Sequence, residues 1–328
     1  MAHLIDTLLL LALPASGKSE VRAFLASHRD EDCRSAFFLG PTVQLDDYPY
    51  VHLMRRFDDE AERLGLDRPF FGSADRPFRD GRDWLTLVEL LNEDYAALHR
   101  PAPAQPPNAA EHLYGRIEAA ATSHGIPPRI GILPAADRMR LLTVLEPECR
   151  SVAADLIAGI PASLEGRTIV IEFARGGPDG SSMPLPDPLG YRASLARLSP
   201  ELLEHASILY IWVTPVESRR KNVERTDPDD PGSILNHGVP IDVMMKDYGC
   251  DDMAWLIGQS DRPGTVTVEA HGRTFHVPVA RLDNRGDLTT FVRGPREGWQ
   301  EAQVRRLRTG LRDALEVLAI APRADAPR

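Results

Sequence analysis

Lysine is almost absent from this chain of 328 residues, since only Lys18, Lys221 and Lys246 stand among its 38 basic residues. Cysteine is equally scarce: three widely spaced residues provide neither a disulfide framework nor a zinc-binding spacing. The strongest apolar run, 8–13, is far too short for a membrane span, and no basic residue precedes it as in a signal peptide. The formal charge of −10 disfavours proteins that wrap nucleic acid or lie on anionic membranes. We therefore expect a cytoplasmic protein, with neither membrane nor nucleic acid as partner.

Lys18 lies in the segment Ala12-Leu13-Pro14-Ala15-Ser16-Gly17-Lys18-Ser19. This segment fits the phosphate-binding pattern G-x-x-x-x-G-K-[ST], with Ala12 in place of the first glycine. An unbroken apolar stretch precedes it, as in a buried parallel strand, and apolar residues at helical spacing follow it. Strand, loop and helix is the order that phosphate binding requires. The alternative is an ordinary strand-to-helix turn with a surface lysine.

Phosphate binding in such a loop relies on backbone N–H groups and on the dipole of the helix that follows. Lys18 would bridge the β and γ phosphates of ATP, and the Ser19 hydroxyl would bind Mg²⁺. The predicted cofactor-binding residues of this loop are Ala15, Ser16, Gly17, Lys18, Ser19 and Glu20.

Further strands and helices alternate along the chain. Strand patterns occupy 42–48, 167–173 and 207–213, followed by a hairpin of 265–269 with 274–282. Helical patterns occupy 50–64, 84–99, 109–123, 135–159 and 295–318. This alternation predicts a three-layer α/β fold, with a mainly parallel sheet flanked by helices and a ligand at the carboxyl ends of the strands. We expect residues 1–54 and 167–328 to form this core. Residues 55–166 would be a mainly helical insertion, an acceptor-binding or lid region too polar and interrupted to form an obvious domain.

Four pieces of the sequence, in order, carry a resemblance to a known family. They are the 12–19 segment, Asp46-Asp47-Tyr48, Glu172 with Arg175, and the arginine-rich 217–225 segment. With them the chain resembles the nucleoside- and nucleotide-kinase branch of the P-loop NTPase superfamily, in outline over 1–50 and 167–291. The resemblance implies a P-loop fold and an ATP- and Mg²⁺-dependent phosphotransferase. Its acceptor would be a small metabolite bearing a hydroxyl or phosphate group, such as a nucleoside or nucleotide.

The resemblance also implies roles for the acids. Asp46 or Asp47 would be the catalytic base; adjacent side chains on an extended segment point to opposite sides, so only one can face the phosphate. The alternative for both is a polar turn. Glu172 would hold Mg²⁺ through water, and Arg175 would bind the acceptor or the transferred phosphoryl group. The alternative for this second pair is a Glu172–Arg175 ion pair.

Cations after the strand at 207–213 would close over the phosphates, as in the lid of the kinases that the chain resembles. Arg219 and Arg220 would neutralise charge on the transferred group and Arg225 would contact the nucleotide, with the acidic segment 226–233 as a mobile lid. The alternative is a solvated helix with Glu217–Lys221 and Arg220–Glu224 pairs. Asn284, after the last strand, would lie against the nucleotide base, or would belong to a turn.

Other functions stay open at this point. The chief alternative is a nucleotide-binding regulatory or scaffold protein with little or no acceptor phosphorylation. A toxin-like kinase acting on a sugar nucleotide and a polynucleotide kinase are also compatible with the sequence, as is GTP in place of ATP. The oligomeric state is open, and a homodimer is compatible with the sequence.

Overall fold

The computed structural model describes residues 3–225 and 238–321. Its strands are β1 (Thr7–Leu11), β2 (Thr42–Asp46), β3 (Thr168–Phe173), β4 (Ala206–Trp212), β5 (Thr265–Ala270) and β6 (Arg273–Asp283). Its longer helices are α1 (Lys18–Ala26), α2 (Asp30–Phe37), α3 (Tyr48–Arg63), α4 (Asp83–Leu98), α5 (Ala109–Ser123), α6 (Ala135–Ala158), α9 (Pro215–Arg225) and α12 (Glu301–Ile320). The shorter ones are α7 (Gly190–Leu195), α8 (Pro200–His205), α10 (Ile241–Lys246) and α11 (Met253–Gln259), with 3-10 turns at Thr290–Arg293 and Arg296–Gly298.

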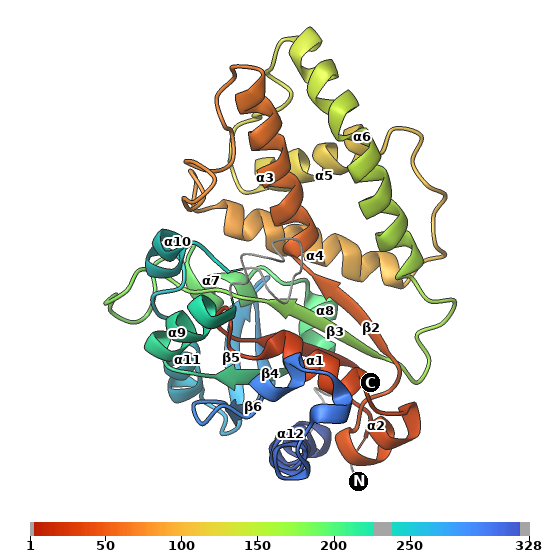
Figure 1. Ribbon diagram of the computed structural model, residues 1–328, viewed down its shortest axis with the longest axis vertical. Coiled ribbons are helices and arrows are strands. Elements are labelled where there is room, and N and C mark those ends of the chain that lie inside the picture. Colours follow the sequence, from red (N-terminus) through yellow and green to blue (C-terminus); the bar gives the residue numbers. More distant parts are fainter. Residues whose placement is uncertain (1–2, 226–237, 322–328) are drawn as a thin grey trace.

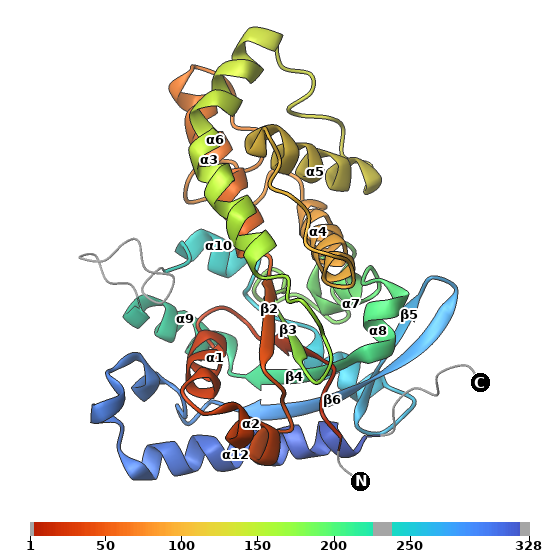
Figure 2. The same ribbon diagram turned by 90° about the vertical axis from the view of Figure 1, so that its right-hand side faces the viewer.

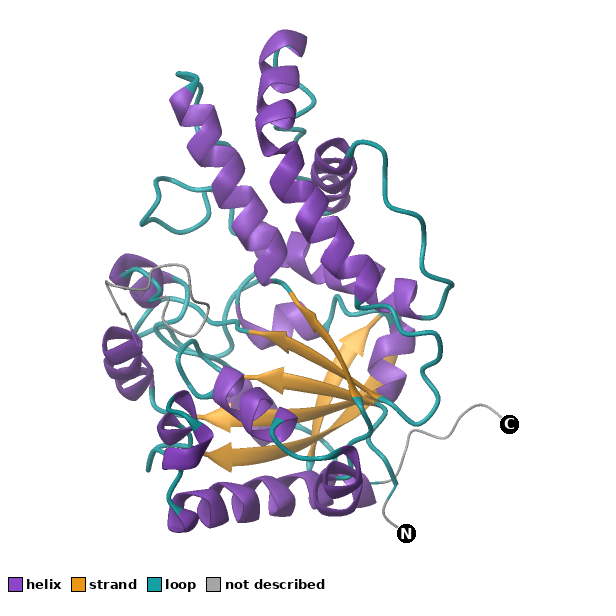
Figure 3. Cartoon of the chain, turned by 45° about the vertical axis from the view of Figure 1, so that its right-hand side comes forward, coloured by secondary structure: helices purple, strands orange, loops and turns teal. Residues whose placement is uncertain are grey.

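The strands form one sheet in the order β2-β3-β1-β4-β6-β5. All neighbours are parallel except β5, which pairs with β6 in the predicted hairpin. Because five strands run the same way, their carboxyl ends meet at one edge (Figure 3). This edge is where the sequence analysis placed a ligand.

Helices cover both faces of the sheet, which gives the predicted three-layer α/β fold (Figures 1 and 2). Leu8 and Leu10 of β1 pack on the face covered by α1, α2 and α12. Leu9 and Leu11 pack on the opposite face, against residues of α4, α7, α8 and α11. A central parallel strand is buried on both sides, which explains why its sequence is apolar without alternation.

The helical segment between β2 and β3 has an apolar core of its own. Helices α3, α5 and α6 stand above the sheet in Figure 1, and Phe57, Tyr114 and Leu141 are among the side chains buried between them. Helix α4 contributes to both cores: Leu87 faces the insertion, whereas Val88 packs toward the sheet. The segment that the sequence analysis described as too polar and interrupted to form an obvious domain thus buries an apolar cluster. Its apolar residues are dispersed along the sequence and meet only when the helices pack.

Several short helices were not predicted. Helices α7, α8 and α10 span six residues each, too few for a helical repeat of apolar residues to be recognised. The last helix begins at Glu301 instead of 295, because two 3-10 turns occupy the preceding segment.

Candidate functional site

The Ala12–Ser19 loop connects the central strand β1 to helix α1 at the carboxyl edge of the sheet. Ala15 and Gly17 both have left-handed backbone conformations, with φ of 55° and 105°. Gly17 precedes α1, and no side chain caps this end of the helix. Within residues 3–225 and 238–321, no protein acceptor takes a hydrogen bond from the N–H groups of Ser16, Gly17 or Ser19. The loop therefore presents several backbone donors together at a helix N-terminus.

Lys18 folds back along this loop. Its ammonium group donates to the carbonyl oxygens of Ala12, at 3.1 Å, and Leu13, at 3.4 Å. The side chain is 8% exposed, so it is not the surface lysine of the alternative interpretation. These hydrogen bonds place its positive charge beside the start of the loop.

Two side chains from distant segments fix other carbonyl groups of the loop. Ser218 Oγ, in α9, donates to Pro14 O at 2.7 Å. Asn284 Nδ2, directly after β6, donates to Ser16 O at 2.8 Å. These contacts turn the carbonyl oxygens toward the protein, which holds the loop open.

Gly17 is required sterically as well as conformationally. A Cβ atom at this position would lie 2.5 Å from Thr289 Oγ1 and 2.7 Å from Asn284 Nδ2. Both neighbours are buried and hydrogen-bonded to each other at 2.9 Å, so they cannot withdraw easily. The loop thus depends on glycine at the position where the motif has it.

Asn284 does not have the surface to contact a nucleotide base. Its side chain is fully buried, and its Oδ1 accepts a hydrogen bond from Leu288 N at 2.6 Å while its amide nitrogen holds Ser16. The sequence interpretation of Asn284 as a base contact is therefore corrected. Lys221 of α9 supports the same segment, because its buried ammonium group donates to Asp287 Oδ1 at 3.0 Å and Asn284 O at 3.4 Å.

Asp46 and Glu172 lie on one face of neighbouring strands near α1. Asp46 is opposite Glu172 in the β2–β3 register, and Glu172 is opposite Leu10 of β1. Arg22, one helical turn after Lys18, donates to Glu172 Oε2 at 2.8 Å and lies 3.8 Å from Asp46 Oδ2. In the described part of the chain, Glu172 Oε1 accepts no hydrogen bond.

The pKa of Asp46 is raised to about 6, chiefly by burial; Arg22 opposes this shift, and the charges of Asp47 and Glu172 add to it. Low-dielectric surroundings disfavour the charged carboxylate, which is the first cause of the shift. A carboxyl group with this pKa is still largely ionised at pH 7 and accepts a proton more readily than an ordinary aspartate.

Asp47 faces a different partner. Its Oδ2 accepts from Arg175 Nη1 at 2.6 Å, and the Arg175 side chain is 1% exposed. The guanidinium group lies 5.0 Å from the ring centroid of Trp84 in α4 and 5.0 Å from that of Phe173. The Glu172–Arg175 pair of the alternative interpretation does not form. Arg175 instead joins the Asp46–Asp47 turn to the helical insertion.

Arg219 and Arg220 of α9 are already paired. Arg219 contacts Asp179 at 3.2 Å, and Arg220 forms ion pairs with Glu217 and Glu224. The Arg220–Glu224 pair of the alternative interpretation is confirmed, whereas Glu217 pairs with Arg220 instead of Lys221. The side chain of Arg225 and the 226–233 segment lie outside the described residues.

Ser19 and Glu172 are the residues that could hold Mg²⁺. Ser19 is half-buried in the first turn of α1, and the free oxygen of Glu172 is a hard ligand of the kind that Mg²⁺ prefers. No cluster of three or more His, Cys, Asp or Glu side chains suited to a metal exists in the part of the chain that the structure describes. A divalent ion here would therefore depend on phosphate oxygens and water for its other ligands. Glu20 is buried and paired with Arg293 at 2.6 Å, which leaves only its backbone for a ligand.

Sequence reasoning missed three residues that shape this site: Arg22, Ser218 and Thr289. Arg22 had a signal, because four residues separate it from Lys18 and side chains at that spacing share a helix face. Ser218 and Thr289 had none, since Ser218 contacts Pro14 and Thr289 lies against Gly17, both far away in the sequence.

Neither the protein-family models nor the curated proteins compared with this chain gave a match. Among the described residues, no helix is both long and apolar enough to cross a membrane.

Proposed function

We propose that this protein is a P-loop kinase-like phosphotransferase that binds ATP with Mg²⁺ in the Ala12–Ser19 loop. It would transfer the γ-phosphoryl group to a small hydroxyl- or phosphate-bearing acceptor, such as a nucleoside or nucleotide. The observation that carries the proposal is the loop itself. The N–H groups of Ser16, Gly17 and Ser19 donate to no acceptor within residues 3–225 and 238–321, while Lys18, Ser218 and Asn284 hold carbonyl oxygens of the loop. Such an array of donors at a helix N-terminus suits a polyphosphate.

The carboxylates support transfer and not binding alone. Asp46 is the better candidate for the base, because Asp47 is tied to the buried Arg175 at 2.6 Å. The raised pKa of Asp46, about 6, also suits proton acceptance near neutral pH. Glu172 would orient Mg²⁺ through water from the oxygen that Arg22 leaves free. Phosphoryl transfer depends mainly on positioning and charge stabilisation, which these groups are placed to supply.

One observation favours a second candidate, a nucleotide-binding regulatory protein without an acceptor. Arg175, Arg219 and Arg220, the candidate cations for the transferred group, are all paired with carboxylates. Transfer would require at least one of these pairs to open when nucleotide binds. A protein that only senses nucleotide has no such requirement.

Nucleotide affinity tests the binding site. Calorimetric titration should give tighter ATP binding with Mg²⁺ than with chelator, and Lys18→Ala should lose about 2 kcal/mol or more of binding free energy. Lys246→Ala removes an exposed lysine at the end of α10 and is the matched control. Equal ATP affinity in Lys18→Ala and wild type would refute the site.

Coupled ADP release across a panel of metabolites then separates the two candidates. Turnover stimulated by one acceptor supports the phosphotransferase. Nucleotide binding with a hydrolysis rate indifferent to every acceptor, but sensitive to a protein partner, supports the regulator.

A further inference from the structure

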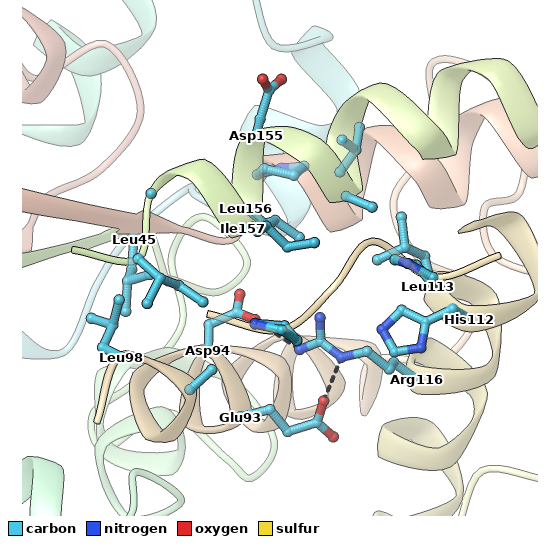
Figure 4. Close-up of a pocket in the computed structure, with 18 of the residues that line it drawn as sticks. Leu45, Glu93, Asp94, Leu98, His112, Leu113, Arg116, Asp155, Leu156 and Ile157 are labelled. Atoms are coloured by element: carbon cyan, nitrogen blue, oxygen red, sulfur yellow. Dashed lines mark hydrogen bonds and ion pairs between the residues drawn. The ribbon is translucent and has the colours of Figure 1, made fainter. Parts of the chain in front are cut away.

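A cavity of about 430 Å³ lies beside the edge strand β2, and no residue of the Ala12–Ser19 loop lines it. Helices α4, α5 and α6 and the proline-rich connector between α4 and α5 enclose it, as Figure 4 shows. Leu45, Leu98, Leu113, Leu156 and Ile157 give it largely apolar walls. Sites for small organic ligands have this size and this kind of lining, with a few polar groups that fix orientation.

Arg116 forms a cluster with two of the carboxylates that line the cavity, Glu93 and Asp94. Its Nε donates to Glu93 Oε2 at 2.7 Å, and its Nη2 donates to Asp94 Oδ1 at 2.8 Å. The other oxygen of Asp94 accepts from the Tyr50 hydroxyl at 2.7 Å. Arg116 is thus shared between two carboxylates and is not available as the main anchor of an anionic ligand.

Glu93 has one unused acceptor. Within the described residues, its Oε1 receives no hydrogen bond, and its side chain is 37% exposed. Figure 4 shows Glu93 and Arg116 together on one side of the cavity, whereas the Asp155 carboxylate points away from it. The Glu93–Arg116–Asp94 group has a formal charge of −1, so it attracts a cation and repels an anion.

We propose that this cavity binds a small amphiphilic amine, with its apolar body between the leucine-lined walls and its protonated nitrogen at Glu93. Apolar burial would supply most of the affinity, and the charge at Glu93 would supply the preference for an amine. The lining includes Asp46, the candidate base, but no residue of the Ala12–Ser19 loop, and amine binding is tested here without nucleotide or turnover.

Three probes with one ring and different charges test the proposal: 2-phenylethylamine, 2-phenylethanol and phenylacetate. Their affinities for the full-length protein can be measured by titration calorimetry or ligand-observed NMR at low ionic strength, without nucleotide. The amine should bind about fivefold more tightly than the alcohol, as expected for one partly exposed charge interaction, and the carboxylate should bind most weakly. Equal binding of amine and alcohol, or no binding of any probe up to its solubility limit, would overturn the proposal.

Two variants locate the site. Glu93→Gln removes the charge and keeps an oxygen for Arg116, so the amine should lose its preference while the alcohol binds as before. Glu89→Gln, one turn earlier in α4 and outside the cavity lining, is the control and should preserve the preference. Ala97→Phe places a ring in the cavity and should abolish binding of all three probes. An amine preference that survives Glu93→Gln contradicts the proposal even if Ala97→Phe fails to fold.

Discussion

The Ala12–Ser19 loop and the acids of the neighbouring strands occupy the same edge of the sheet but are prepared in opposite ways. In the loop, protein groups bind the carbonyl oxygens, and the N–H groups of Ser16, Gly17 and Ser19 have no acceptor among the described residues. At the acids, arginines already neutralise the charges: Arg22 contacts Glu172 at 2.8 Å and Arg175 contacts Asp47 at 2.6 Å. The difference supports the proposal that the loop binds an anion with little rearrangement. The acids, in contrast, must release their arginine partners before they can act on a ligand; if they do not release them, their role is structural.

The largest expected effect is the loss of ATP affinity in Gly17→Ala, which disrupts the Ala12–Ser19 loop. Gly17→Ala introduces a Cβ within 2.5 Å of Thr289 Oγ1 at a φ of 105°. Backbone strain and steric overlap together should destabilise the native loop conformation by about 3 kcal/mol. ATP affinity, measured by calorimetric titration, should then fall about a hundredfold or more.

The control for this substitution is Gly115→Ala in helix α5. A Cβ there meets no atom within 4 Å, so the variant should bind ATP normally and gain up to about 1 kcal/mol of stability. Wild-type ATP affinity in Gly17→Ala would show that the loop is not the binding site.

The second-largest expected effect is the loss of stability when the buried Asp47–Arg175 ion pair is broken. Asp47→Asn leaves the 1%-exposed guanidinium of Arg175 without its carboxylate, and should lower the free energy of unfolding by about 3 kcal/mol. Urea denaturation at pH 7 measures the change. A loss below about 1 kcal/mol, the value typical of exposed pairs, would mean that Arg175 exchanges partners freely.

Asp46 gives a smaller effect that depends on pH. Its pKa in the folded protein is raised from 3.8 to about 6, so folding favours the protonated carboxyl. Its stabilising contribution is therefore complete below pH 3.8 and is lost as the pH rises to about 6. Asp46→Asn should remove this loss and be more stable than wild type by about 2 kcal/mol at pH 7.

Unfolding free energies of both proteins at several pH values measure this contribution as a difference, which cancels the similar titrations of Asp58, Asp247 and Asp251. A difference between the proteins that does not vary with pH would contradict the raised pKa.

The smallest expected effect is at Arg22. Its side chain is 32% exposed, so Arg22→Gln should cost only about 1 kcal/mol of stability. Because Arg22 lowers the pKa of Asp46, its loss should raise that pKa above 6, as followed by NMR titration of the carboxyl carbon. Arg29→Gln removes an 80%-exposed arginine directly before helix α2 and should change neither the stability nor the pKa of Asp46. An unchanged Asp46 pKa in Arg22→Gln would show that Arg22 does not lower the pKa of Asp46.

The sequence predicted the elements whose signals are local. Patterns among neighbouring residues were enough to predict three features. These are the buried strand before Lys18, the strand-to-helix order and the mainly parallel sheet. The sequence analysis also expected the adjacent Asp46 and Asp47 side chains to point to opposite sides. Their different partners, Arg22 and Arg175, agree with this expectation.

What the sequence could not provide are contacts between distant segments. Asn284 was interpreted as a base contact because it follows a strand, yet it lies buried against Ser16, 268 positions earlier. The core of the helical insertion was missed for the same reason, because Phe57 and Tyr114 become neighbours only through helix packing.

The most direct test of the central claim is an amide NMR titration with ADP and Mg²⁺. The account predicts that the largest shifts fall on the N–H groups of Ser16, Gly17, Lys18 and Ser19, and that Lys18→Ala abolishes them. Shifts confined to other parts of the protein, with these four amides unmoved at saturating nucleotide, would contradict it.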